Sequence, residues 1–130
     1  MPLRANLSVL DNIAVIPQFR QNLDYASAAQ LAWNLLLAAG YDGAASRRDP
    51  QLDYSERFVA KLLRLAIGAT PIILIDRPAM LLPDIDYPSF LNDLLGRLSD
   101  HLNECWILDY RWNAPLYPHP LPLPLPLAPR

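Results

Sequence analysis

The stretch that decides the fold is Pro71-Ile-Ile-Leu-Ile-Asp76, which is followed by Arg77 and Pro78. Four consecutive aliphatic residues are typical of a strand buried inside a parallel sheet. A carboxylate at the end of such a strand is suited to hold a magnesium ion. The next residue is an arginine, whose guanidinium stays protonated at physiological pH and therefore cannot accept a proton from water. The stretch thus places a carboxylate beside a side chain that cannot act as a general base.

The composition fits one modest globular domain. The chain has 130 residues, of which 52% are hydrophobic and 18% charged, and this balance excludes a wholly disordered protein. Its formal net charge is −2, and its eleven basic residues are scattered along the chain. The charge pattern therefore predicts neither a nucleic-acid partner nor a polybasic membrane patch.

No targeting or membrane-spanning segment is predicted. The first residues carry no sustained apolar region before a small-residue cleavage site, which a secretory signal would need. Asn34 interrupts the longest apolar run, so no run reaches the length of a membrane span. We expect a cytoplasmic protein, with a peripheral position on the inner face of the cell membrane left open.

Cysteine and histidine do not suggest a metal site. Cys105 is the single cysteine, and we expect it to be a small buried hydrophobe. His101 is expected at the end of a helix and His119 in the C-terminal tail, and no cluster of Cys and His exists.

Hydrophobic periodicity predicts three helices in the first half of the chain. The first runs from Ser8, its capping residue, to Ile16, with a connection over residues 17–22. The second begins at a cap on Asp24 or Ser27 and ends at Gly40. Apolar side chains cover most of its circumference, so we expect burial on more than one side. These are Leu31, Trp33, Leu35, Leu36, Leu37 and Ala38.

The third helix is predicted from near Ser55 to Gly68, after a loop over residues 41–51. Its apolar stripe is expected to face the core. The stripe consists of Phe58, Val59, Leu62, Leu63, Ala66 and Ile67. Arg57, Lys61 and Arg64 are expected to face water.

The second half predicts a parallel α/β arrangement. The strand that ends at Asp76 is followed by a Pro- and Asp-rich loop, then by a helix beginning near Pro88 and a strand over residues 104–109. The helix is expected to turn five leucines inward. They are Leu91, Leu94, Leu95, Leu98 and Leu102. We therefore expect a helix-rich α/β fold with two parallel strands.

The tail over residues 114–130 has a different character. It contains seven of the fourteen prolines, and its alternating Leu and Pro residues predict polyproline II or disorder. Pro115-Leu-Tyr-Pro118 has the spacing of a ligand for an aromatic groove. A solvated tail, or translation past the natural end of a damaged gene, are the alternatives.

From Leu7 to Tyr110 the chain resembles the second half of an ATP-binding-cassette (ABC) ATPase, nearest to the ATPase subunits of lipid-transporting MCE-type systems. Ser8-Val-Leu-Asp-Asn-Ile-Ala14 resembles the segment after the Q-loop, and Leu52-Asp-Tyr-Ser-Glu56 lies where the signature motif belongs. Arg64 stands where the signature helix of the family usually has an Arg. Asp76 resembles the Walker B aspartate.

The resemblance implies a partial P-loop NTPase core within residues 1–113. Residues 8–68 would form the helical subdomain and residues 69–113 the Walker B half. In the family this core binds ATP and Mg²⁺ and attaches to a transmembrane transporter subunit. A homodimer, or a separate chain carrying the missing N-terminal half, are the further partners implied. Asp76 would be the magnesium ligand.

Departures from the family pattern imply that catalysis has been lost. The Gly-rich phosphate loop with its Lys and the Gln of the Q-loop are missing. Asp53, Tyr54 and Ser55 replace the Ser and both glycines of the signature. Arg77 replaces the catalytic Glu, and Tyr110 replaces the switch His. No catalytic residue and no bound cofactor are therefore expected for this chain alone.

One further departure lies in the loop after Walker B, where Pro83 replaces an Asp and Asp84 is one step away. Asp76 has a simpler interpretation as a residue that caps the next loop. Arg77 likewise has a simpler interpretation, as the partner of Asp76, Asp84 or Asp86 in a surface ion pair.

The three tryptophans are expected in the core or over the subdomain contact. They are Trp33, Trp106 and Trp112.

The leading hypothesis is a degenerate ABC-type ATP-binding subunit, or a fragment of one, that does not hydrolyse ATP. The alternatives are a non-enzymatic interaction module and the product of a truncated or split gene. Because two parallel strands alone leave open edges and apolar surface, we expect the chain to self-associate or to need a partner that completes the sheet.

Overall fold

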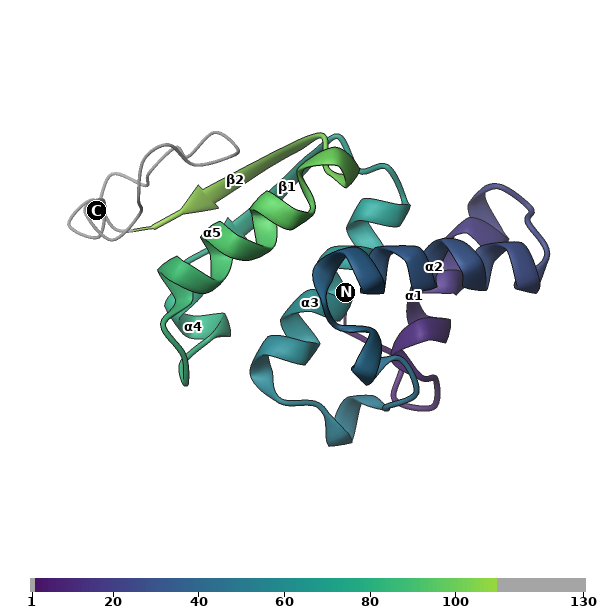
Figure 1. Cartoon of the computed structure of the whole chain (residues 1–130), viewed down its shortest axis with the longest axis horizontal. Helices are drawn as coiled ribbons and strands as arrows, with labels where there is room; N and C mark the ends of the chain where they lie inside the picture. Colours follow the sequence, from purple (N-terminus) through teal and green to yellow (C-terminus); the bar gives the residue numbers. More distant parts are fainter. Residues whose placement is uncertain (1, 110–130) are drawn as a thin grey trace. The chain divides into compact units, whose positions relative to one another are not determined.

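The computed structural model describes residues 2–109, which fall into two units divided between Ala69 and Thr70. Each unit has its own buried apolar residues. The first unit is built from helices, and the second holds the sheet (Figure 1). The helix-rich α/β class with two parallel strands is confirmed.

Three helices pack on one another in the first unit. They are α1 (Val9–Arg20), α2 (Tyr25–Ala39) and α3 (Tyr54–Ile67). Two short 3-10 helices, η1 (Asp42–Ala44) and η2 (Asp49–Gln51), lie in the connection between α2 and α3. Small and aliphatic side chains fill the space between the helices. The fully buried ones include Val9, Ile13, Ala14, Ala28, Ala32, Leu36, Val59 and Leu63.

The first helix is longer than predicted. We expected it to end at Ile16, but α1 continues through Pro17 to Arg20. A proline inside a helix lacks the N–H that would bond to the preceding turn, so it usually ends one. Here Pro17 is buried, and its carbonyl oxygen accepts from the backbone N–H of Gln21 at 3.0 Å. We infer that tertiary packing around Pro17 stabilises the helix beyond the proline.

The second helix is buried on one side only, and the prediction of broader burial is wrong. Its buried residues are Ala28, Ala32, Leu35, Leu36 and Ala39. Leu31, Trp33 and Leu37 are exposed instead. Three alanines at helical spacing let the neighbouring helices approach one side closely, and this leaves the larger side chains on the other. The expected place of Trp33 in the core is therefore wrong as well.

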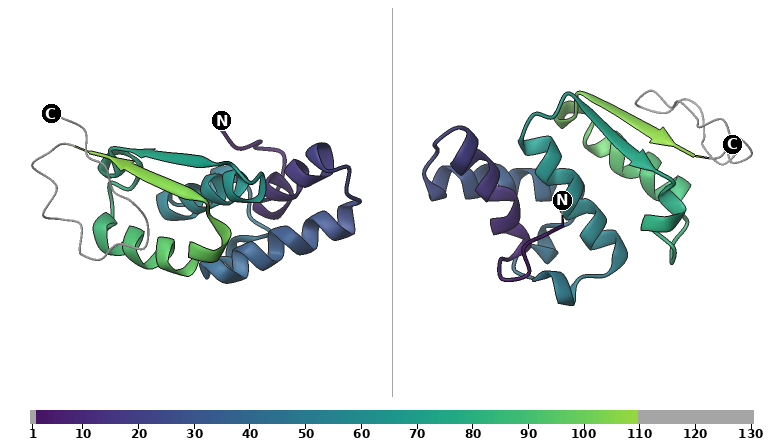
Figure 2. Two further views of the ribbon diagram at one scale, coloured as in Figure 1. Left: turned by 90° about the horizontal axis from the view of Figure 1, so that it is seen from above. Right: turned by 180° about the vertical axis from the view of Figure 1, so that it is seen from behind.

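The second unit is a parallel pair of strands with a helix on one face. Strands β1 (Ile72–Asp76) and β2 (Glu104–Leu108) pair in register, with Leu74 opposite Trp106. Helix α5 (Tyr87–Arg97) runs along the pair, as the views in Figures 1 and 2 agree. It ends earlier than predicted, and the 3-10 helix η3 (Ser99–His101) follows it.

The two faces of this sheet differ sharply. Ile73, Ile75, Cys105 and Ile107 are buried, as are the helix leucines that were predicted to point inward. Neighbouring residues along a strand point to opposite faces. The face opposite α5 therefore carries Ile72, 48% exposed, and Leu74, 58% exposed. The strands are covered on one side among the described residues, rather than buried on both.

Candidate functional site

The first part of the candidate site lies where β1 ends. Asp76 is the last residue of the strand, and its side chain is exposed. Arg77 donates from Nη2 to Oδ2 of Asp76 at 3.3 Å. The backbone N–H of Arg77 also donates to the carbonyl oxygen of Leu108 at 2.6 Å, which extends the strand pairing by one step. The predicted ion pair with Asp76 is thus confirmed.

The backbone of Arg77 has a conformation that favours glycine. Its φ is 46°, in the left-handed region, where a residue other than Gly is strained. This turn directs the chain from the strand into the short helix α4 (Pro78–Leu81), in a segment that was predicted to be a loop. Pro78 takes the first helical position, where its missing N–H costs nothing. Pro83 and Asp84 lie beyond it and are exposed.

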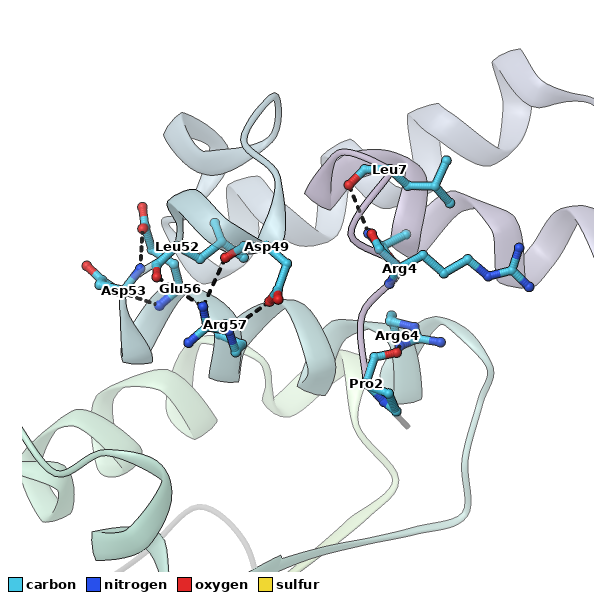
Figure 3. A network of polar contacts seen from close by, with 10 residues as sticks. Pro2, Arg4, Leu7, Asp49, Leu52, Asp53, Glu56, Arg57 and Arg64 are labelled. Carbon is cyan, nitrogen blue, oxygen red and sulfur yellow. Dashed lines mark hydrogen bonds and ion pairs between the residues drawn. The ribbon is translucent and has the colours of Figure 1, made fainter.

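The second part of the candidate site is the amino end of α3, where Asp53 is the capping residue. The backbone N–H of Glu56 donates to Oδ1 of Asp53 at 2.8 Å, and the backbone N–H of Asp53 donates to Oε1 of Glu56 at 3.1 Å (Figure 3). Ser55 donates from Oγ to the same Asp53 oxygen at 2.8 Å. Tyr54 is exposed. Asp53, Ser55 and Glu56 therefore form a closed cap.

The Asp53 carboxylate is negatively charged at neutral pH, while the neighbouring Glu56 is paired with Arg47, whose Nη1 lies 2.6 Å from Oε2 of Glu56. The N–H of Glu56 is the largest cause that lowers the pKa of Asp53, and the hydrogen bond from Ser55 and the charge of Arg47 lower it further. The N-terminus of a helix attracts anions through free N–H groups and a positive dipole end. At α3 the protein's own carboxylate takes this place. The N–H of Glu56 therefore already has an acceptor within the protein.

Arg57 joins the loop before α3 to the helix. Its Nε donates to Oδ1 of Asp49 at 2.7 Å, and its Nη2 donates to the carbonyl oxygens of Asp49 at 2.9 Å and Leu52 at 3.3 Å (Figure 3). Arg57 was predicted to face water, but only 30% of its side chain is exposed. Because its guanidinium is held by the loop, the cap at Asp53 sits on a fixed turn.

Arg64 is also less exposed than predicted. Its Nη1 donates to the carbonyl oxygen of Pro2 at 3.0 Å, which ties the start of the chain to α3 (Figure 3). Burial lowers the pKa of Arg64, and the charge of Arg4 adds to the effect. This residue, which resembles the Arg of the signature helix, holds the N-terminal segment.

Asn12 is a buried residue whose role the sequence analysis missed. Its Nδ2 donates to the carbonyl oxygens of Arg4, Leu7 and Ser8 at 3.0–3.2 Å, and its Oδ1 accepts from the N–H of Arg4 at 2.8 Å. Asn12 belongs to the segment that resembles the stretch after the Q-loop. Its position one residue after Asp11, in the first turn of a capped helix, was the signal that could have indicated it.

The predicted site residues divide between the two units. Residues 53–55 belong to the first unit, and Asp76 and Arg77 to the second. Tyr110, Trp112, His119 and the Pro115–Pro118 motif lie outside the described residues. Cys105 is buried as predicted, and burial raises its pKa to about 11.

Neither a metal cluster nor a membrane span is found in the part of the chain that the structure describes. Within residues 2–109, no group of three or more His, Cys, Asp or Glu is placed to hold a metal ion. Over the same range, no helix combines the length and apolar character that crossing a bilayer requires. No protein-family model matches the chain, and no curated protein matches its sequence.

Proposed function

We propose that the chain is a non-hydrolysing ABC-type ATP-binding subunit, or the C-terminal part of one, that serves a membrane transporter of the lipid-transport class. In this proposal it corresponds to the helical subdomain and Walker B half of a partial P-loop NTPase core. Its role is to bind partner proteins, and any energy from ATP comes from another chain.

The ion pair of Asp76 and Arg77 carries the proposal. A carboxylate at the end of a parallel strand matches the family's magnesium ligand, and the following position is the one that would hold the water-activating base. A guanidinium there cannot take a proton, and it neutralises the neighbouring carboxylate. The pairing supports a site that keeps the family's framework without its chemistry.

The closed end of α3 supports the same conclusion from a separate element. In the ABC ATPases that the chain resembles, the corresponding helix end approaches the γ-phosphate across a dimer interface. Oδ1 of Asp53 is engaged by its own helix, and the carboxylate brings a negative charge toward any approaching phosphate. Loss of phosphate binding at α3 and loss of the base after β1 are consistent with one another.

The outward side of α2 supports a protein partner for the helical unit. This helix contains no charged residue over its 15 positions, although one side of it faces away from the unit's buried residues. Leu31, Trp33 and Leu37 are exposed there, and Nε2 of Gln30 donates to Oδ1 of Asn34 at 2.9 Å beside them. An uncharged surface with an exposed Trp is typical of the centre of a protein interface.

Complementation tests the proposal directly. The full chain is to be co-expressed with the N-terminal half of an MCE-type ATPase that carries the phosphate loop. We expect a stable one-to-one complex that binds an ATP analogue with the affinity of the phosphate-loop half and hydrolyses no ATP.

The matched control is the same half co-expressed with a Leu74→Asp variant, which places a charge on the sheet. Absence of a complex with the unmodified chain would contradict the proposal and favour the interaction-module alternative. In that case substitution of Trp33 by Ser should still weaken binding to a transporter subunit.

A further inference from the structure

The outer edge of β1 carries backbone groups that the β1–β2 pair does not use. In a sheet, alternate residues of a strand direct their N–H and C=O groups toward one neighbouring strand, and the residues between them direct theirs to the other side. The backbone N–H of Arg77 donates to the carbonyl oxygen of Leu108, so Arg77 and every second residue before it point toward β2. The backbone groups of Ile72, Leu74 and Asp76 therefore point away from β2.

This edge is open in the part of the chain that the structure describes. The sheet there has two strands, and within residues 2–109 no hydrogen bond outside the strand pair involves the backbone of Ile72, Leu74 or Asp76. The side chains of all three are exposed. An unpaired edge is a template for pairing with another strand, and proteins usually protect it with a Lys, a Pro or a charge within the strand. Residues 72–75 are all aliphatic, so they carry no such protection.

We propose that two copies of this chain pair along β1 in antiparallel orientation, with Leu74 on the two-fold axis, so that the two strand pairs form one four-stranded sheet. In this register Leu74 lies opposite its own copy, and Ile72 lies opposite the second copy's Asp76. All the outward-pointing residues of both strands then form hydrogen-bonded pairs. A register shifted by two residues leaves one of them on each strand without a partner in the other strand. A shift by one residue places outward-pointing groups opposite inward-pointing ones.

The side chains fit the same arrangement. Leu74 and its copy meet on the face opposite α5, with their Cα atoms about 5.5 Å apart, as in a hydrogen-bonded antiparallel pair. The two Asp76 carboxylates lie at opposite ends of the paired strands, roughly 14 Å apart at about 3.4 Å per residue. Like charges therefore do not face each other across the strands, and each Asp76 is also paired with Arg77 of its own chain.

The symmetry of β1 favours a second copy over an unrelated strand. A two-fold contact places the same residues on both sides, and the pattern of outward groups on β1 is complementary to itself about Leu74. The contact is small beside a standard protein interface, so the dimer should be reversible. The inference does not depend on the proposed function, because neither a nucleotide nor another protein takes part in it. The tests below use the full chain alone, so their failure and failure of the proposed function are distinguishable.

Disulfide trapping tests the position of the two-fold axis. Leu74→Cys is compared with Ile72→Cys, since both residues are about half exposed and lie on the same face of the strand. The separation of residue 74 from its copy suits a disulfide, whereas residue 72 lies roughly 14 Å from its copy along the strands. The native Cys105 is buried in both variants. Under mild oxidation we expect on the order of ten-fold more disulfide-linked dimer for Leu74→Cys. Equal yields would overturn the proposal.

Sedimentation equilibrium tests the dimer without a covalent bond. The unmodified chain is compared with Leu74→Lys and with Leu81→Lys, which adds the same charge at a residue of α4 that is 44% exposed. Leu74→Lys places like charges directly opposite each other, so it should raise the dimer Kd by on the order of ten-fold or more. Leu81→Lys should leave the Kd unchanged. An unmodified chain that stays monomeric up to near-millimolar concentration would overturn the proposal, and so would a dimer that Leu74→Lys leaves intact.

Leu74→Pro tests the backbone contact itself. Proline removes the N–H of residue 74, which β2 does not use, and proline is tolerated in an edge strand when its missing N–H faces solvent. We expect this variant to keep the circular dichroism spectrum of the unmodified chain at low concentration and to lose the dimer. A dimer of unchanged Kd would contradict pairing along this edge. Loss of the folded state would show that the chain itself uses this N–H, and that result would contradict the proposal as well.

Discussion

Asp53 and Glu56 close the amino end of α3 on each other. Each backbone N–H donates to the other residue's carboxylate, at 2.8 Å and 3.1 Å. This is a capping box with Asp in place of the usual Ser or Thr. The amino end of α3 is thereby closed by the side chains of its own first turn.

Asp53→Ala should lower the free energy of unfolding by about 1 kcal/mol, because the helix loses its cap. The measurement is chemical denaturation of the variant beside the unmodified chain. Asp53→Asn is the matched control, since Asn caps a helix nearly as well. It should change the free energy of unfolding by only a few tenths of a kcal/mol, in either direction. A larger loss for Asn than for Ala would show that the cap is not what Asp53 supplies.

The stability that Asp53 contributes should depend on pH in the acid range. Its pKa is lowered in the folded state, so the folded state binds its proton less readily than the unfolded state. The contribution is complete above the unfolded pKa of about 3.9 and is lost as pH falls through the folded pKa. The free energy of unfolding of the unmodified chain, taken relative to that of Asp53→Asn, should therefore fall as the pH drops below about 4. A difference that stays constant down to pH 2 would contradict this.

Asn12→Asp should cost about 3 kcal/mol or more, because a carboxylate cannot donate to the three carbonyl oxygens that Asn12 now satisfies. Asn34→Asp is the control, since exposed Asn34 acts only as an acceptor from Gln30 and an aspartate can still accept. Thermal unfolding followed by circular dichroism would compare them. Similar melting temperatures for the two variants would mean that the Asn12 cluster contributes little.

Arg77 should tolerate Gly better than Val. Its positive φ carries strain of about 1–3 kcal/mol, which Gly relieves and a β-branched residue increases. The exposed ion pair with Asp76 that is lost in both variants is worth about 0–1 kcal/mol. We expect Arg77→Gly to unfold at the same or higher denaturant concentration than the unmodified chain, and Arg77→Val at a lower one. The reverse order would show that side-chain contacts of Arg77 outweigh its backbone.

Much of the fold follows from local patterns. The cap at Ser8 and the glycine at Gly40 mark helix ends where they were predicted, with φ 79° at Gly40 allowing the left-handed turn, and of the two caps predicted for α2 the structure has Asp24. The aliphatic run before Asp76 forms the strand, and the leucines of the last helix are buried. These features depend on residues that are close together in the sequence, so they can be predicted from it.

The features that were missed depend on tertiary packing. Pro17 remains helical because it is buried, and Arg57 turns from water because Asp49 lies within reach. The side of α2 that packs against the neighbouring helices is the one with the small alanines. A prediction based on the number of large apolar residues does not identify this side. At the candidate site, the Asp53-x-x-Glu56 capping pattern is present in the sequence, but the sequence analysis compared Asp53 only with the Ser of the signature motif that the segment resembles.

Restoring the missing carboxylate should not restore activity. Arg77→Glu supplies a residue that can accept a proton, but the chain still has no phosphate loop to position the nucleotide, and positioning provides most of phosphoryl-transfer catalysis. A fluorescent ATP analogue should show no saturable binding to this variant below the millimolar range. Tight, saturable binding would reveal a phosphate site that neither the sequence motifs nor the described residues indicate.

Under the proposed function, this chain keeps the framework of an ATPase without its chemistry. The most direct measurement is steady phosphate release by the full chain with ATP and Mg²⁺, beside an Asp76→Ala variant and buffer alone. We predict that all three give the same rate, because the base, the phosphate loop and the open helix end are absent together. Release clearly above buffer that Asp76→Ala abolishes would contradict the account.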